Sequence, residues 1–229
     1  ASKVIIRDFG ELENLQVKKK GPKDFVTKTD KRVEEILIQE LTKSKKNYSF
    51  ITEETGIIKN SNKDTFWIID PIDGTTNFLH GIPHFAISIA LKFNNEIMSG
   101  VIFDPIKNEI FYAEKNNGSF FNNQRIRVSK KNDLDECLFS TNHLGAKYSD
   151  LNLRYTGCAS LDLAYVGSGR LDGYFHNNIN IWDIAAGAII VEEAGGKVND
   201  LNNFEINNID IRAASSNIYS KMLEKLKNF

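Results

Sequence analysis

The sequence predicts an α/β fold in which helices and sheets are stacked in layers, and two observations indicate it. Residues 84–129 alternate apolar and polar side chains and are interrupted by turn residues, which is typical of an antiparallel sheet. On both sides of this stretch, segments with apolar residues at helical spacing are mixed with short apolar runs of strand length. Because helices and strands occur in both halves of the chain, we expect layers of each packed against one another.

The predicted elements begin with a helix that Thr29 and Asp30 can cap. Two short buried strands follow, and each ends at acidic residues. An antiparallel meander comes next, and the second half adds two helices, a strand and a terminal helix. The expected ranges are 29–43 for the first helix, 48–52 and 66–69 for the strands, 84–129 for the meander, 161–168 and 183–194 for the next helices, 211–214 for the last strand, and 217 onwards for the terminal helix.

The composition is that of an ordinary globular protein. The chain has 229 residues, 41% of them hydrophobic, and its dispersed charges sum to −1, so we expect no direct contact with nucleic acid or anionic lipid. No apolar run approaches the ~20 residues that span a bilayer, and the N-terminus lacks the layout of a signal peptide. Cys137 and Cys158 cannot form a disulfide framework, which together with these features favours the cytoplasm.

The run DPIDGTT at positions 70–76 combines features of a metal site and a phosphate site. A hydrophobic strand delivers Asp70 and Asp73 into a turn that Pro71 stiffens and Gly74 permits. Carboxylate and carbonyl oxygens are the ligands that Mg²⁺ prefers. Behind the turn a short helix would begin, with free N–H groups suited to phosphate.

Simpler interpretations of each feature exist. The DPIDGTT run could be an ordinary turn between a strand and a helix, because Asp, Pro and Gly are common there. Glu53 and Glu54 could be a solvated pair, and Asp183 could cap the helix 183–194 rather than bind an ion. However, Glu53 ends the strand before Asp70, so the two strand ends could lie together.

Four motifs in order resemble those of the inositol monophosphatase family. They cover nearly the whole chain, at similar spacing, and their combination is far more specific than any one of them. The resemblance implies a layered αβαβα sandwich, also found in fructose-1,6-bisphosphatases, with one domain made of half-domains near 1–130 and 131–229 that share a cleft. The motifs are FVTKTD at 25–30, ITEE at 51–54, FWIIDPIDGTTNF at 66–78, and WDIAAG at 182–187 running on to EAGG at 193–196.

The resemblance also implies an activity, which is hydrolysis of inositol monophosphate by water that Mg²⁺ activates. Two Mg²⁺ ions are implied, with a third near Glu53 as an option, and lithium sensitivity is expected. Glu53, Thr75 and Asp30 would act in catalysis, with Thr75 orienting the water and Asp30 hydrogen-bonded behind it. The implied ligands are Glu53, Asp70 and the Ile72 carbonyl for one ion, and Asp70, Asp73 and Asp183 for the other.

Substrate contacts follow from the same resemblance. The N–H groups of Gly74 and Thr75 would hold the phosphate, Asp73 and Asp183 would also contact the substrate, and the turn Gly157-Cys158-Ala159 would contact the leaving group. The family carries an acid seven residues before the Trp-Asp aspartate, but His176 stands there in this chain. A carboxylate accepts two hydroxyl hydrogen bonds, whereas a neutral imidazole accepts one and donates one. Fructose 1,6-bisphosphate, histidinol phosphate or a 3′-phosphonucleotide therefore stay open as substrates, and an ordinary surface histidine is the simpler interpretation.

Two further expectations concern the loop after the meander and the partners. The stretch between Thr141 and Arg154 is shorter than in the family, so the site is more open or residues are absent there. The likeness to bacterial inositol monophosphatases is closest along 161–175, and these are often homodimers. A different class of function is a binding module that contacts RNA polymerase, as some bacterial relatives are thought to do.

Overall fold

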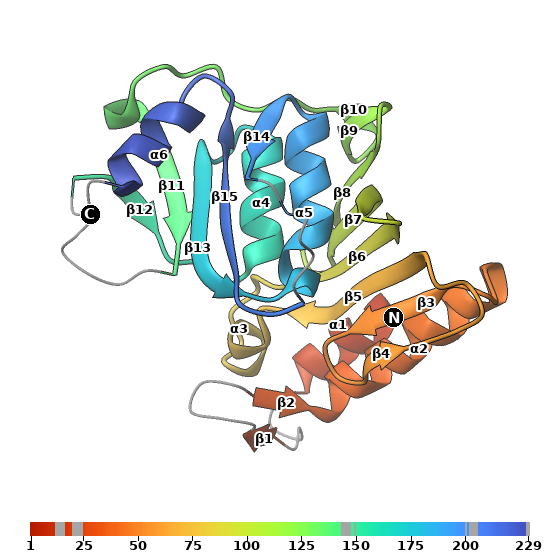
Figure 1. Ribbon diagram of the computed structural model, residues 1–229. Coiled ribbons are helices and arrows are strands. Elements are labelled where there is room, and N and C mark those ends of the chain that lie inside the picture. The colour runs from red at the N-terminus through yellow and green to blue at the C-terminus, as the bar shows by residue number, and fades with distance from the viewer. Residues whose placement is uncertain are drawn as a thin grey trace.

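Helices and sheets alternate in layers in the computed structural model, which describes residues 1–11, 17–19, 25–142, 148, 150–199, 201 and 206–227 (Figure 1). Helices α1 (Ser2–Gly10) and α2 (Lys28–Ser44) form one outer layer, followed by an eight-stranded sheet, helices α4 (Ala159–Gly167) and α5 (Ile181–Glu193), a five-stranded sheet, and helix α6 (Tyr219–Lys227). The expected αβαβα sandwich is therefore confirmed. No helix in the described part of the chain is long and apolar enough to cross a membrane.

The eight-stranded sheet is antiparallel except at one pair of strands. Strands β3 and β5 run parallel, with Thr52 opposite Ile69, so both strands point their C-terminal ends to the same edge. The expected meander is confirmed as β6 to β10, each strand antiparallel to the next. In spatial order the strands are β10 (Gln124–Arg125), β9 (Gly118–Phe121), β8 (Glu109–Glu114), β7 (Glu96–Asp104), β6 (Ala86–Phe93), β5 (Thr65–Asp73), β3 (Ser49–Thr52) and β4 (Gly56–Ile58).

Helices α4 and α5 fill the space between the two sheets. Both are mostly apolar around their circumference, as expected for helices that are covered from two directions. They approach closely, because a Cβ added at Gly187 would lie 2.4 Å from Cβ of Leu163. The main hydrophobic core is therefore the layer of α4 and α5 with the sheet faces on either side.

The five-stranded sheet carries α6 on its outer face. Phe139, Phe175 and Met222 belong to the small core beneath that helix. Strand β13 is parallel to β11 and antiparallel to β15. In spatial order the strands are β12 (Asn152–Arg154), β11 (Leu138–Thr141), β13 (Gly173–Ile179), β15 (Ile209–Ser215) and β14 (Gly196–Val198), and the short 3₁₀ turn η2 (Leu134–Glu136) precedes β11.

One predicted boundary was wrong in an informative way. The strand expected to stop at Asp70-Pro71 continues as β5 to Asp73. Its pairing with β6 is irregular between Asp70 and Asp73, so the missing N–H of Pro71 falls where the ladder is already interrupted. The other predicted helices and strands are present with ends shifted by one or two residues, whereas the meander expected over 84–129 ends at Arg125. The short β1 (Val17–Lys19) and β2 (Phe25–Thr27) form a separate pair.

Candidate active site

The ends of β3 and β5 lie together, as the sequence predicted. The Glu53 N–H donates to the Ile69 carbonyl at 3.3 Å, which joins the residue after β3 to β5. Glu53 is partly buried there, and Asp70 is 1% exposed. The N–H of Ile72 donates to Oδ1 of Asp70 at 2.9 Å, which fixes the orientation of that carboxylate.

Asp70, Asp73 and Asp183 form a cluster in which one oxygen of each lies within 4.8 Å of the others. Asp70 and Asp73 come from β5, whereas Asp183 comes from the first turn of α5. Oδ2 of Asp183 also accepts the N–H of Asn180 at 3.1 Å in a capping box. Asp183 thus both caps its helix and faces the other carboxylates, so the two interpretations of this residue are compatible.

Burial and mutual repulsion dominate the electrostatics of this cluster. Burial, followed by the charges of Glu53, Asp73 and Asp183, raises the pKa of Asp70 well above its usual value. Burial and the nearby Asp183 and Asp30 raise the pKa of Glu53 in the same way. The pKa of Asp183 is raised to about 7 by burial and by Asp73. Such crowding of acidic oxygens disfavours their ionised forms until a cation compensates their charge.

Helix α3 (Thr75–Leu79) starts directly after the cluster, as the sequence predicted. Gly74 precedes it in the left-handed region with φ of 93°, and a Cβ there would lie 3.0 Å from the His84 carbonyl oxygen. Only glycine fits this position without strain. The Thr75 hydroxyl donates to the Ile72 carbonyl at 2.9 Å. Thr75, which is expected to orient the water, therefore contacts the carbonyl that is expected to bind metal.

The second half of the chain holds Asp73 directly. Oδ2 of Asp73 accepts the Ser160 N–H at 2.6 Å and lies 3.2 Å from Sγ of Cys158. Burial raises the pKa of Asp73, and the hydrogen bonds from Ser160 and Cys158 partly oppose that shift. Burial also raises the pKa of the Cys158 thiol well above its usual value, so its nucleophilic thiolate is disfavoured.

A pocket of about 180 Å³ opens beside the cluster and contains the expected leaving-group residues. Nδ1 of His176 lies 2.8 Å from the hydroxyl of the buried Tyr174. The short stretch before Arg154 lies partly outside the described residues (143–147 and 149). The pocket is lined by Asp73, Thr141, Asn142, Gly157, Cys158, Ala159, Asp162, Tyr174, His176, Ile179 and Asp183.

Supporting residues on α2 complete the site. Asp30 is 2% exposed and close enough for its charge to raise the pKa of Glu53, while its hydrogen bond to Thr75 stays a prediction. Glu34, which the sequence did not single out, accepts the N–H groups of Glu54 and Thr55 at 2.9 Å each. Glu34 is 1% exposed, so a buried carboxylate fixes the turn that carries Glu53.

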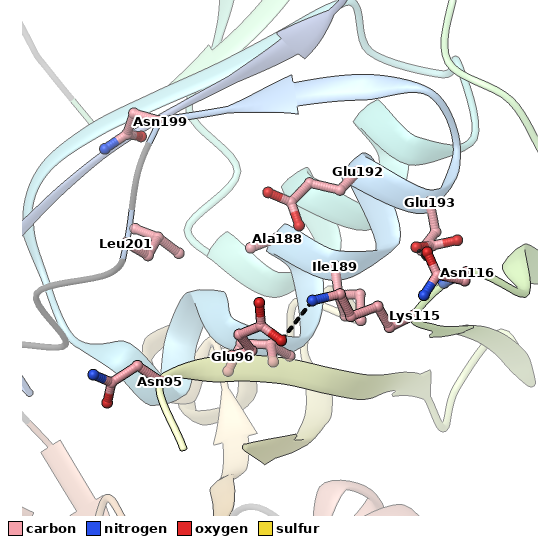
Figure 2. Close-up of a pocket in the computed structure, with 11 residues that line it drawn as sticks. Asn95, Glu96, Lys115, Asn116, Ala188, Ile189, Glu192, Glu193, Asn199 and Leu201 are labelled. Atoms are coloured by element: carbon pink, nitrogen blue, oxygen red, sulfur yellow. Dashed lines mark hydrogen bonds and ion pairs between the residues drawn. The ribbon is translucent and has the colours of Figure 1, made fainter. Parts of the chain in front are cut away.

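A larger cavity of about 270 Å³ lies toward the C-terminal end of α5 (Figure 2). Glu96 and Lys115 form an ion pair of 2.6 Å at its edge, and Glu192 on α5 faces it. None of the site residues expected from the sequence lines it. Asp73, Asp183 and the residues expected to contact the leaving group line the smaller pocket instead.

Comparisons with known proteins show to which family the chain belongs. A family model described as the inositol monophosphatase family matches residues 1–228. Inositol-1-monophosphatase of Caulobacter vibrioides is 39% identical over 99% of this chain and 96% of its own length, and Nus factor SuhB of Haemophilus influenzae is 38% identical over 99% and 91%. The crystal structure of the extragenic suppressor protein SuhB from Bartonella henselae superposes with a TM-score of 0.92 at 41% identity, covering 99% and 93% of the two chains. The chain belongs to the inositol monophosphatase family.

Proposed function

We propose that this chain is a Mg²⁺-dependent phosphomonoesterase that hydrolyses inositol monophosphate. The observation that carries the proposal is the cluster of Asp70, Asp73 and Asp183, whose oxygens lie within 4.8 Å of one another beside the Gly74 turn. Membership of a family of phosphatases supports the reaction class.

The donor set fits a hard divalent cation. Three carboxylates at this spacing offer only oxygen ligands, and their raised pKa values indicate uncompensated negative charge. Glu53, Asp70 and the Ile72 carbonyl would hold one Mg²⁺, and Asp70, Asp73 and Asp183 a second, with room for a third near Glu53. The Ile72 carbonyl has two lone pairs, so it can accept from Thr75 and still bind an ion. Bound Mg²⁺ would lower the pKa of the attacking water and stabilise the charge of the leaving oxygen.

The protein's own groups would position the reactants. The Thr75 hydroxyl and the Glu53 carboxylate would orient the water, with the Asp30 carboxylate behind them. The N–H groups of Gly74 and Thr75 would hold the phosphoryl oxygens, where charge spreads in the transition state. The leaving alcohol would lie in the 180 Å³ pocket against Asp73, Asp183, His176 and the turn Gly157-Cys158-Ala159.

Position 176 bears on which alcohol the pocket accepts. The imidazole of His176 is hydrogen-bonded to the hydroxyl of Tyr174 and cannot accept two hydroxyl hydrogen bonds as a carboxylate does. The same chemistry on fructose 1,6-bisphosphate, histidinol phosphate or a 3′-phosphonucleotide is therefore the alternative. We further propose one domain of two half-domains, a homodimer, a cytoplasmic location and inhibition by lithium.

Contact with RNA polymerase is a second candidate function. The relatives named Nus factor SuhB, 38% identical over as much as 99% of this chain, favour it. A pull-down with purified RNA polymerase tests it directly. The carboxylate cluster argues for catalysis in addition, because a protein that only binds a partner does not require crowded acids in a pocket.

The decisive experiment for the enzyme is phosphate release from a panel of phosphate monoesters, with Mg²⁺ and with EDTA. Substrates are ranked by kcat/KM, because this ratio measures discrimination. We expect Mg²⁺-dependent turnover with inositol 1-phosphate near the top of the ranking. Turnover that persists in EDTA would exclude the metal mechanism, whereas a different leading substrate would correct only the substrate.

A further inference from the structure

The first turn of α4 carries a buried carboxylate that the proposed reaction does not use. Asp162 is 3% exposed, and its Oδ2 accepts the Ser140 hydroxyl at 2.6 Å and the Thr156 hydroxyl at 2.8 Å. Burial raises the pKa of Asp162 to about 7, and these hydrogen bonds act in the opposite direction by stabilising the charged form. Asp162 thus ties strand β11 and the segment before α4 to one buried oxygen.

The turn at residues 156–160, which runs from that segment into the first residues of α4, contacts Asp73 and helix α3 at several points. The side-chain amide of Asn77 on α3 donates to the Thr156 carbonyl at 2.8 Å. The Ser160 N–H and the Cys158 thiol contact Oδ2 of Asp73 at 2.6 and 3.2 Å. A Cβ added at Gly157, whose φ is 79°, would lie 3.2 Å from Asn77, so the backbone of the turn packs directly on α3.

We propose that Asp162 and Thr156 are positioning residues that hold the 156–160 turn and, through it, set the orientation of Asp73. At the start of the turn the Thr156 hydroxyl donates to Asp162, and at its end the Ser160 N–H donates to the Asp73 carboxylate. Loss of the Thr156 hydroxyl changes none of the pocket side chains or acids chemically but removes a partly buried hydrogen bond that supports the turn. The effect on ion binding rests only on the proposed role of Asp73 as a metal ligand, whereas the effect on turnover rests on the proposed function as a whole.

Ser140 supplies a matched control, because its hydroxyl donates to the same Asp162 oxygen from strand β11. The Ser140 hydroxyl also lies 3.2 Å from the Arg154 carbonyl, within the pairing of β11 and β12. Thr156→Val and Ser140→Ala each remove one hydroxyl bond from Asp162, so both variants are expected to lose similar stability. Only Thr156→Val loosens the turn that grips Asp73.

The test is equilibrium Mg²⁺ binding by titration calorimetry without substrate, together with the Mg²⁺ concentration that gives half-maximal phosphate release. Thr156→Val is expected to weaken Mg²⁺ binding about fivefold, the size expected for one lost hydrogen bond. Thr156→Ser, which keeps the hydroxyl, is expected to bind Mg²⁺ with wild-type affinity. Ser140→Ala is expected to lower the Tm as much as Thr156→Val does but to leave the Mg²⁺ affinity unchanged.

The outcomes separate the two proposals. Wild-type Mg²⁺ affinity in Thr156→Val, equal weakening in Ser140→Ala, or no Mg²⁺ binding to the wild-type chain would each overturn the positioning role. Mg²⁺ binding that depends on Thr156 in a chain without phosphatase activity would support the positioning role and contradict the proposed function.

Discussion

Oδ2 of Asp73 accepts the backbone N–H of Ser160 at 2.6 Å, although 87 positions separate the two residues. Ser160 lies in the first turn of α4, whose own N-cap residue, Cys158, makes no side-chain capping bond. A residue proposed to bind metal in the first half of the chain thus supplies the cap of a helix in the second. Assembly of the site and packing of the halves depend on the same carboxylate.

Asp73→Asn separates these two roles. The amide oxygen of Asn can still accept the Ser160 N–H, and the change relieves repulsion among buried acids, so we expect a Tm in EDTA close to that of the wild type. Mutation of residues that hydrogen-bond to metal ligands typically lowers activity by ~10–100-fold, and loss of a ligand should lower it at least as much. We therefore expect kcat/KM to fall by about 100-fold or more. Asp64→Asn, the same substitution at an exposed position, serves as the control. Wild-type turnover by Asp73→Asn would exclude this residue as a ligand.

Gly74→Ala tests the turn that leads into α3. The side chain would meet the His84 carbonyl at 3.0 Å in a left-handed backbone conformation, so a loss of about 1–3 kcal/mol in unfolding free energy is expected, with a large fall in kcat/KM. Gly195→Ala has nearly the same φ, 89°, with nothing within 4 Å of the added Cβ. Denaturant unfolding and kinetics of both variants check the prediction; equal losses of activity would contradict a local role for Gly74.

Metal removal is expected to make stability depend on pH. The pKa values of Asp70, Glu53 and Asp183 are raised on folding, the last to about 7, so the folded chain binds more protons than the unfolded chain. Stability from these groups is therefore present in acid and is lost as the pH rises from about 4 through about 7. In EDTA we expect a lower Tm at pH 8 than at pH 5.5, and Mg²⁺ should raise the Tm most at pH 8. A Tm in EDTA that rises across this range would contradict the arrangement.

The site was predictable where local sequence determines geometry. The DPIDGTT run dictates a turn and a helix start, and the helix that carries Asp183 follows from its apolar pattern and terminal glycines. Helix α1 was not predicted, although its sequence is amphipathic, because its anchor Phe9 packs on Phe78 and Phe85 from distant parts of the chain.

Residues that act only through tertiary contacts could not be predicted either, because their partners are distant in the sequence. Glu34 and Asp162 occupy ordinary helix positions in sequence, yet both are buried carboxylates that accept hydrogen bonds from turns, Glu34 from the turn after β3 and Asp162 from Thr156 before α4. Nothing in the sequence around Ser160 indicates that its N–H reaches Asp73. Burial of a charge far from its partner in sequence is a property of the assembled layers, so it could not be derived from local pattern.

Replacement of His176 tests the leaving-group end of the pocket. His176→Glu would place a carboxylate where the imidazole now bonds to Tyr174, and a carboxylate can accept two hydroxyl hydrogen bonds. The ratio of kcat/KM for inositol 1-phosphate to that for 4-nitrophenyl phosphate, which lacks sugar hydroxyls, is expected to rise about 5–10-fold, the value of about one net hydrogen bond. His176→Gln is the matched neutral control and should leave the ratio near that of the wild type. An unchanged ratio in His176→Glu, with an unchanged Tm, would place the alcohol away from position 176.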